Sequence, residues 1–302
     1  MAITEAEARI VLKSILYLTD FSKPSEEALP FAIAVARKYG GVIYALHILT
    51  PLIPQSCAAA AKADEDIAEL EMKKIDSQLA GVEHETRVER GIEMWPSLEQ
   101  AIRKHKIDVI VLGTHGRTGA QKLLLGSVAE EIFRHSPVPV LTIGPNLRGG
   151  IPNDALFRRV LFATDFTPDS IAAAPYAVSL AQEKYARLIL FHVMPKIEQR
   201  NDASEKLFET SVAETIHQLY QTVPKDTELY CPPEVALEYG EPADGILAAA
   251  KQRAADVIVL GVRRTDSHLG AATHLGRATA HQVVAHAPCP VLTVRGSQVD
   301  RS

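Results

Sequence analysis

The chain has 302 residues, of which 47% are hydrophobic and 23% are charged, a balance typical of a globular protein with room for two ordinary domains. The net charge of −5, with no dominant basic block, argues against a nucleic-acid binder. There is no run of about 18 apolar residues to span a bilayer, and the acidic start lacks a signal-peptide pattern. Three scattered cysteines have no metal-binding spacing, so we expect a cytoplasmic protein without a metal site of its own.

In the first half, strands and helices are predicted to alternate along the chain. The strands are expected near residues 13–19, 42–48, 85–90, 108–112 and 138–143, and the helices near 24–39, 63–80, 97–106 and 127–135. Pro24 suits a first helical turn, and Gly40-Gly41 ends that helix. Continuous apolar strands separated by helices indicate a parallel sheet that is covered on both faces. Ligands of such a sheet bind beyond the carboxyl ends of its strands.

The second half of the chain repeats the first. Ile15–Ser22 (ILYLTDFS) reappears 145 residues later as Val160–Thr167 (VLFATDFT), and His47-Ile48 reappears at the same offset as His192-Val193. By residues 137–143 the offset has grown to 151, which small loop insertions explain. A fixed order of matching segments indicates one domain that is present twice.

The repeat predicts the domain organisation. We expect one domain over residues 1–147 and a second over 154–302, joined by a segment at 146–154 that is rich in turn-forming residues. The predicted fold class is α/β, with two tandem doubly wound domains, each built on a five-stranded parallel sheet.

A glycine-containing loop between a predicted strand and a predicted helix is the clearest candidate site. It runs from Gly113 through Gly116 to Gly126 and Ser127. Glycines at a strand exit and a helix entry let backbone N–H groups approach a phosphate with no Cβ in the way. The free N–H groups at residues 126–128 and the helix dipole, roughly half a positive charge, favour phosphate oxygens. The loop therefore predicts a phosphate-binding site.

Two further segments end at the same edge of the predicted sheet. The carboxylate of Asp20 can accept a hydrogen bond from an adenine amino group, and the backbone of Ile48 can bind the ring edge through an N–H and a C=O. The candidate ligand residues also have purely structural explanations. Asp20 can cap the helix that follows it, and the loop glycines can be ordinary turn residues. We interpret His47 and His192 as core or hydrogen-bonded histidines.

Thr19-Asp20-Phe21-Ser22, His47-Ile48 and the Gly-x2-Gly-x9-Gly-Ser loop at 113–127 together resemble the universal stress protein family, over nearly the whole chain. The resemblance implies a Rossmann-like domain of the adenine nucleotide alpha hydrolase-like kind. It also implies an ATP-binding stress sensor or regulator of the stress response, with Mg or Mn at the phosphates. The ligand residues that it implies are Thr19, Asp20, Ile48, Gly113, His115, Gly116, Arg117, Gly126, Ser127 and Val128.

The corresponding loop of the second half departs from this pattern. Arg264 replaces the second glycine, and Arg277 stands where the first half has a serine. The distance from Gly261 to Gly276 is 15 residues, against 13 in the first half. We therefore expect one ATP per chain, bound by the first half.

The role of the second half stays open at the level of sequence. Asp165 and Val193 stand where the first half has Asp20 and Ile48, which is compatible with an adenine pocket. One interpretation is a pseudo-site retained for folding. The other is a site for a different anion or nucleotide at Arg263, Arg264 and Arg277, since guanidinium groups bind phosphates in a bidentate manner.

The sequence favours a regulator over a dedicated enzyme. It lacks the Gly-x4-Gly-Lys-Ser/Thr loop, and no catalytic residue can be assigned. The alternative is a slow nucleotide hydrolase or nucleotidyl-transfer enzyme at the same site, and weak self-phosphorylation belongs to the same alternative. Electron-transfer flavoproteins share the broad architecture and form a third class.

The expected partner is an adenine nucleotide, without nucleic acid or membrane. The last strands of the two halves, at 138–143 and 291–294, are apolar. We expect them to pair as separate subunits of single-domain relatives do, which makes the chain an intramolecular pseudo-dimer. A homodimer of whole chains would need other surfaces.

Overall fold

The computed structural model describes residues 10, 12–50, 58–114, 126–148, 157–196, 202–262 and 272–296, without the side chains of 58–61, 127, 134, 202–208 and 272–278. The chain divides into two compact units. The first unit is built from Val11–Pro145, and the second from Phe157–Ser302, to which Asn146–Arg148 also belongs.

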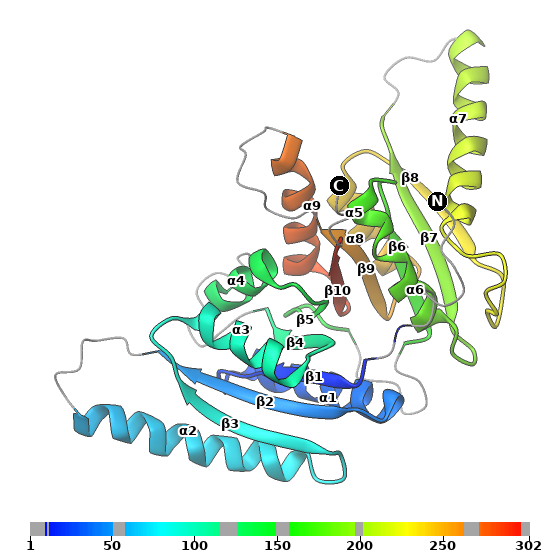
Figure 1. Ribbon diagram of the computed structural model, residues 1–302. Coiled ribbons are helices and arrows are strands. Elements are labelled where there is room, and N and C mark those ends of the chain that lie inside the picture. Colours follow the sequence, from blue (N-terminus) through cyan, green and yellow to red (C-terminus); the bar gives the residue numbers. More distant parts are fainter. Residues whose placement is uncertain are drawn as a thin grey trace, which may run out of the picture. The chain divides into compact units, whose positions relative to one another are not determined.

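The first unit alternates strands and helices in the predicted order (Figure 1). Its elements are β1 (Ser14–Leu18), α1 (Lys23–Tyr39), β2 (Val42–Leu49), α2 (Ala58–Gln78), β3 (His84–Arg90), α3 (Met94–His105), β4 (Val109–Gly113), α4 (Ser127–His135) and β5 (Val140–Ile143). Helix α2 begins at Ala58, five residues before the predicted start, because it includes an alanine run of high helix propensity.

All five strands of the first unit are parallel, in the order β3-β2-β1-β4-β5. Helices α1 and α2 cover one face of this sheet, and α3 and α4 cover the other, as right-handed crossovers require (Figure 1). The order reverses between β1 and β4, whose carboxyl ends lie side by side. This switch point is where a ligand of a doubly wound sheet binds.

Local sequence explains where α1 begins and ends. Ser22 is the N-cap, and its side chain accepts a hydrogen bond from the Ser25 N–H. Pro24 lies in the first turn, and Gly40 ends the helix with a left-handed φ of 59°. The predicted start and stop of this helix are confirmed.

An aspartate just before β4 fixes the start of β1. Asp108 Oδ2 accepts hydrogen bonds of 2.8 Å from the N–H groups of Lys13 and Ser14. Asp256 makes the same pair of bonds to Arg158 and Arg159 in the second unit, at 2.9 and 2.8 Å. The two central strands of each sheet are therefore tied together at their amino ends.

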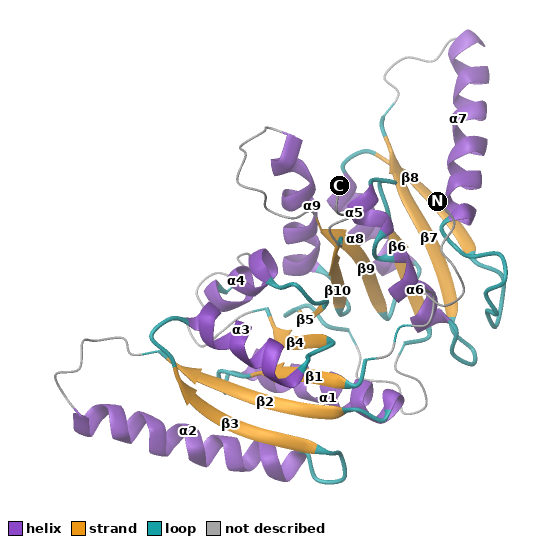
Figure 2. Cartoon of the chain, viewed as in Figure 1, coloured by secondary structure: helices purple, strands orange, loops and turns teal. Residues whose placement is uncertain are grey.

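The second unit repeats this architecture. Its elements are β6 (Arg159–Ala163), α5 (Pro168–Ile171), α6 (Ala174–Ala181), β7 (Arg187–Met194), α7 (Asp202–Gln221), β8 (Glu234–Tyr239), α8 (Pro242–Gln252), β9 (Val257–Val262), α9 (Ala272–His286) and β10 (Val291–Arg295). Its strand order, β8-β7-β6-β9-β10, corresponds strand for strand to that of the first unit. Figure 2 shows the strands of each unit gathered in a sheet with helices on both sides.

The helix after the first strand differs between the units. It is continuous in α1, which contains Pro30, but it is divided into α5 and α6 in the second unit, where Pro175 lies at the start of α6. Pro30 removes one hydrogen bond inside α1, whereas Pro175 lies in the first turn of α6, where a proline is tolerated. Among the described helices, none is long and apolar enough to cross a membrane.

Candidate functional site

The structure brings four of the predicted ligand residues to one edge of the first sheet. Thr19 and Asp20 follow β1, Gly113 ends β4, and Ile48 lies near the end of β2. Because β1 lies between β2 and β4, these residues share the carboxyl edge at the switch point. The predicted residues His115, Gly116 and Arg117 lie outside the described part of the chain.

The turn after β1 is built by its own side chains. Asp20 Oδ1 accepts a 3.0 Å bond from the Ser22 N–H and a 2.5 Å bond from the Ser22 hydroxyl. Thr19 Oγ1 accepts a 3.0 Å bond from the Phe21 N–H. Asp20 is therefore not the helix cap itself, since Ser22 has that role, but it holds the cap residue in place.

The same turn contains a residue in an unfavourable backbone conformation. Phe21 has φ of 59°, in the left-handed region that costs an ordinary residue about 1–2 kcal/mol. Such conformations persist where surrounding contacts impose them. His47 supplies one such contact, since its ring centroid lies 4.4 Å from that of Phe21, with an interplanar angle of 39°.

His47 is also hydrogen-bonded, as predicted. Its side chain is 8% exposed, and Nδ1 lies 2.7 Å from the Thr19 carbonyl oxygen. A carbonyl oxygen only accepts, so Nδ1 carries the proton. The prediction that His47 is a core or hydrogen-bonded histidine is confirmed.

Tyr17 stabilises the start of α1 from beneath the site. Its hydroxyl donates a 2.8 Å bond to the Ser25 carbonyl oxygen. Burial raises the pKa of Tyr17 to about 12, so the phenol stays neutral at physiological pH and keeps this bond. Sequence reasoning missed Ser25, although its repetition as Ser170 at the same offset of 145 signals its role.

The backbone of Ile48 faces the space beyond the end of β1. The last residue pair in the register of β1 and β2 is Leu18 with Leu46, and the Thr19 N–H then bonds to the Leu46 carbonyl at 3.1 Å. In a strand, residues two apart direct their N–H and C=O groups to the same side. The N–H and C=O of Ile48 therefore point to the side of β1, past the residue where β1 ends.

Gly113 has a packing role that the sequence did not indicate. A Cβ at this position would lie 2.6 Å from the carbonyl carbon of Pro24 and 2.9 Å from the backbone nitrogen of Ser25. The first turn of α1 therefore lies directly on the end of β4. In the second unit, a Cβ on Gly261 would lie 2.7 Å from the carbonyl carbon of Asp169. This packing accounts for a glycine at both positions, whatever either unit binds.

The start of α4 is held beside the end of β4. The Gly126 N–H donates a 2.8 Å bond to the carbonyl of Thr114, which directly follows β4. Gly126 is the N-cap, and no described side chain caps this helix. The N–H groups of Ser127 and Val128 have no acceptor within the helix, as in any first helical turn. They lie at the positive end of the α4 dipole, close to the switch point.

The turn after β6 reproduces the first-unit geometry. Asp165 Oδ1 accepts bonds of 3.0 and 2.5 Å from the backbone and hydroxyl of Thr167, and His192 Nδ1 lies 2.7 Å from the Thr164 carbonyl. Phe166 has φ of 61°. The side chains of this turn are therefore needed for its architecture in both units.

The helix after β9 begins differently from α4. Gly276 and Arg277 match Gly126 and Ser127 in the repeat, yet α9 already begins at Ala272. The N–H of a residue four positions into a helix bonds to the helix itself. The position that matches the α4 start is therefore inside α9. Arg263 and Arg264 lie outside the described residues.

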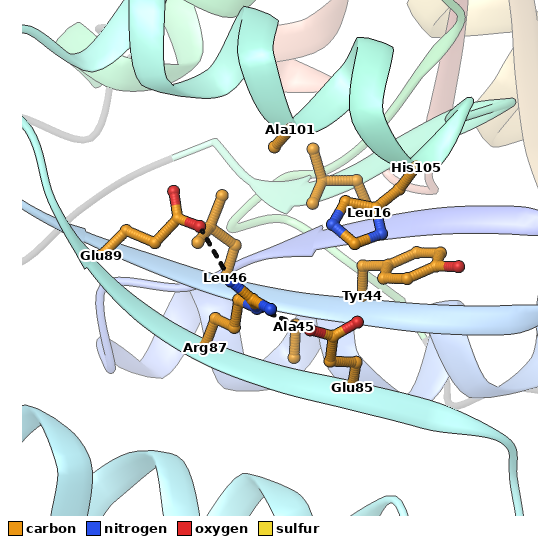
Figure 3. A pocket seen from close by; sticks show the side chains of 9 residues that line it. All are labelled: Leu16, Tyr44, Ala45, Leu46, Glu85, Arg87, Glu89, Ala101 and His105. Atoms are coloured by element: carbon orange, nitrogen blue, oxygen red, sulfur yellow. Dashed lines mark hydrogen bonds and ion pairs between the residues drawn. The ribbon is translucent and has the colours of Figure 1, made fainter.

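A small pocket lies on the α3 face of the first sheet, and none of the residues that line it is a predicted ligand residue (Figure 3). It is lined by Leu16, Tyr44, Ala45, Leu46, Glu85, Arg87, Glu89, Ala101 and His105. Arg87 Nε lies 2.5 Å from Glu85 Oε1, and a guanidinium nitrogen lies 3.9 Å from Glu89. The hydrogen bond from Arg87 holds the pKa of Glu85 below its usual value. Two carboxylates balance this cation, so the pocket is a poor anion site.

Among the described residues, there is no group of three or more His, Cys, Asp or Glu side chains that could hold a metal ion.

Comparison with known proteins establishes the family. The model of the universal stress protein family matches residues 12–144 and again residues 156–295. The chain therefore belongs to the universal stress protein family and carries two of its domains. The resemblance noted in the sequence and the two-domain α/β fold are both confirmed.

Two relatives each match about half of this chain. A universal stress protein of Methanocaldococcus jannaschii is 31% identical over 139 residues, which cover 43% of this chain and 81% of that protein. One from Thermus aquaticus is 34% identical over 143 residues, which cover 46% of this chain and 100% of the relative.

Solved structures show the same fold at two-domain length. A universal stress protein from Archaeoglobus fulgidus superimposes with a TM-score of 0.64 at 24% identity, over 94% of this chain and 98% of the other. A universal stress protein in complex with cAMP is 23% identical and covers 44% of this chain and 98% of its own, with a TM-score of 0.37. The first similarity supports the fold. The TM-score of the second is too low to support any conclusion about the site.

Proposed function

We propose that the first unit binds ATP, one molecule per chain, and that the protein acts as a nucleotide-dependent regulator of a stress response in the cytoplasm. The observation that carries the proposal is the position of the α4 start. The bond between Gly126 and Thr114 holds an N-terminus without a described side-chain cap beside the end of β4, where the strand order reverses.

The adenine ring and the phosphates would each have a matching group at this edge. Asp20 would accept a hydrogen bond from the adenine amino group, and the Ile48 backbone would bind the ring edge through its N–H and C=O. The N–H groups of Ser127 and Val128 would donate to phosphate oxygens. Mg or Mn would neutralise the phosphates, with few ligands from the protein.

The stoichiometry of binding tests the proposal. Titration of the full chain with ATP and Mg²⁺ in a calorimeter should give a value near one per chain, since α9 does not offer a helix start at the matching position. A value near two would show that the second unit also binds ATP. Absence of binding would contradict the proposal.

A matched pair of variants assigns the site to the first unit. Asp20→Asn keeps an oxygen acceptor for Ser22 but loses the carboxylate charge, and we expect it to weaken ATP binding by about tenfold. Asp165→Asn makes the same change in the second unit and should leave the affinity unchanged. Equal losses in both variants would contradict the assignment. Release of ADP or AMP in the same samples would support the alternative of slow turnover at this site.

We also propose, on the sequence repeat alone, that the two halves pair as a pseudo-dimer. Cleavage of the 146–154 segment by limited proteolysis should then leave two fragments that elute together in size-exclusion chromatography under native conditions. Two fragments that separate freely would contradict the pairing.

A further inference from the structure

We propose that His47 is the positioning residue of the candidate nucleotide site: its Nδ1–H bond to the Thr19 carbonyl holds the turn that carries Asp20. The inference rests on the proposed function, because it concerns how Asp20 is presented to the ligand. It adds a residue that does not itself touch the nucleotide.

The turn after β1 is strained at the residue that follows Asp20. Phe21 follows Asp20 directly and has φ of 59°, a conformation that an ordinary residue leaves unless contacts impose it. A relaxed Phe21 would rotate the adjoining peptide and move Asp20, which is one residue away. The direction of the Asp20 carboxylate, which also bonds to Ser22, therefore depends on the two peptides that flank Asp20.

His47 contacts the residues on both sides of Asp20. Nδ1 donates to the Thr19 carbonyl at 2.7 Å, and the imidazole ring packs against Phe21 at a centroid distance of 4.4 Å. His47 lies on β2, one residue before Ile48. The same side chain thus couples the strand that would bind the ring edge to the turn that would bind the amino group.

The geometry of this histidine does not depend on the phosphate loop. His192 makes the matching bond of 2.7 Å to Thr164, and its ring lies 4.7 Å from that of Phe166. The second unit therefore offers an internal control, since it has the same histidine geometry but no helix start at the matching position.

A correctly placed carboxylate has a specific consequence for ligand choice. Adenine presents an amino group to Asp20, whereas guanine presents a carbonyl oxygen there, which a carboxylate repels. A site built to accept an N–H bond rejects the analogue that lacks the donor. The ratio of ATP to GTP affinity therefore reports the position of Asp20, and it does not change when only the folded fraction of the protein changes.

The test uses the full chain with ATP and GTP in the presence of Mg²⁺. His47→Phe keeps a ring against Phe21 and removes the N–H donor. We expect ATP binding to weaken about tenfold and the ATP-to-GTP affinity ratio to fall, as for a misplaced hydrogen bond to a charged group. His47→Asn carries an amide N–H close to the position of Nδ1 and should keep both values within about twofold of the unmodified protein.

Two further variants complete the design. His47→Gln places its amide one carbon further out and should behave as His47→Phe, which covers the case in which the phenylalanine variant does not fold. His192→Phe should lower the melting temperature to a similar extent as His47→Phe and leave both affinities unchanged, since it alters the same contact in the other unit.

The outcomes separate the two proposals. If the unmodified protein binds ATP and the Phe and Gln variants keep its ATP-to-GTP ratio, the role of His47 is overturned and the proposed function stands. If His47→Asn loses as much discrimination as His47→Phe, the assignment to the Nδ1–H bond is overturned. If the unmodified protein does not bind ATP, the proposed function fails, and the role of His47 fails with it.

Discussion

Gly113→Ala is expected to destabilise the first unit severely, by about 3 kcal/mol or more. The added Cβ would lie 2.6 Å from the Pro24 carbonyl carbon and 2.9 Å from the Ser25 backbone nitrogen. Both atoms belong to the main chain at the start of α1, so neither can swing away as the tip of a flexible side chain would. Chemical denaturation followed by circular dichroism would measure the loss.

Two other glycines control this experiment. Gly261→Ala should destabilise the second unit in a similar way, since its Cβ would lie 2.7 Å from the Asp169 carbonyl carbon. Gly40→Ala has no atom within 4 Å of the added Cβ and should cost only about 1 kcal/mol, from its φ of 59°. If Gly113→Ala were as stable as the unmodified protein and lost only ATP binding, its glycine would serve the ligand and not the packing.

Gly126→Val is expected to lower ATP affinity by about 100-fold or more while the protein stays folded. The φ of −62° and ψ of 150° at Gly126 are open to any residue, and the bond from its N–H to Thr114 survives the substitution. A β-branched side chain at the N-cap would crowd the approach of phosphate oxygens to the N–H groups of Ser127 and Val128. Calorimetric titration would measure the affinity.

Thermal melting controls for stability, since valine is a poorer N-cap than glycine by about 1 kcal/mol. Gly276→Val in α9 gives the matched change in the second unit and should leave ATP binding intact, because that position lies inside a helix. A folded Gly126→Val variant with unchanged affinity would remove the start of α4 from the binding site.

The sequence by itself determined the elements and their duplication. Apolar strands of four to eight residues are buried on both faces and can be recognised without their partners. The start of α1 at Ser22 and its end at Gly40 follow from capping rules that act within a few residues. The sequence predicted the start of α2 only near residue 63, and not at Ala58, because an alanine run carries no amphipathic period.

The strand order was decided only by the tertiary structure. The sequence predicted a doubly wound sheet, but the position of the reversal depends on which strands pair, and this is not visible in any one strand. The order β3-β2-β1-β4-β5 is what brings the end of β1 beside the end of β4. Asp20 and Gly113, which are far apart in the sequence, meet at one edge for this reason.

The roles of individual site residues also needed the structure. Gly113 appeared in the sequence as a phosphate-loop glycine, whereas its closest constraint is the main chain of Pro24, about ninety residues earlier. His47 appeared as a core histidine, and its bond to Thr19 became visible only when β1 and β2 were placed side by side. A local pattern records propensity and burial, but a contact between distant segments is a property of the packed chain, so only the tertiary structure could assign it.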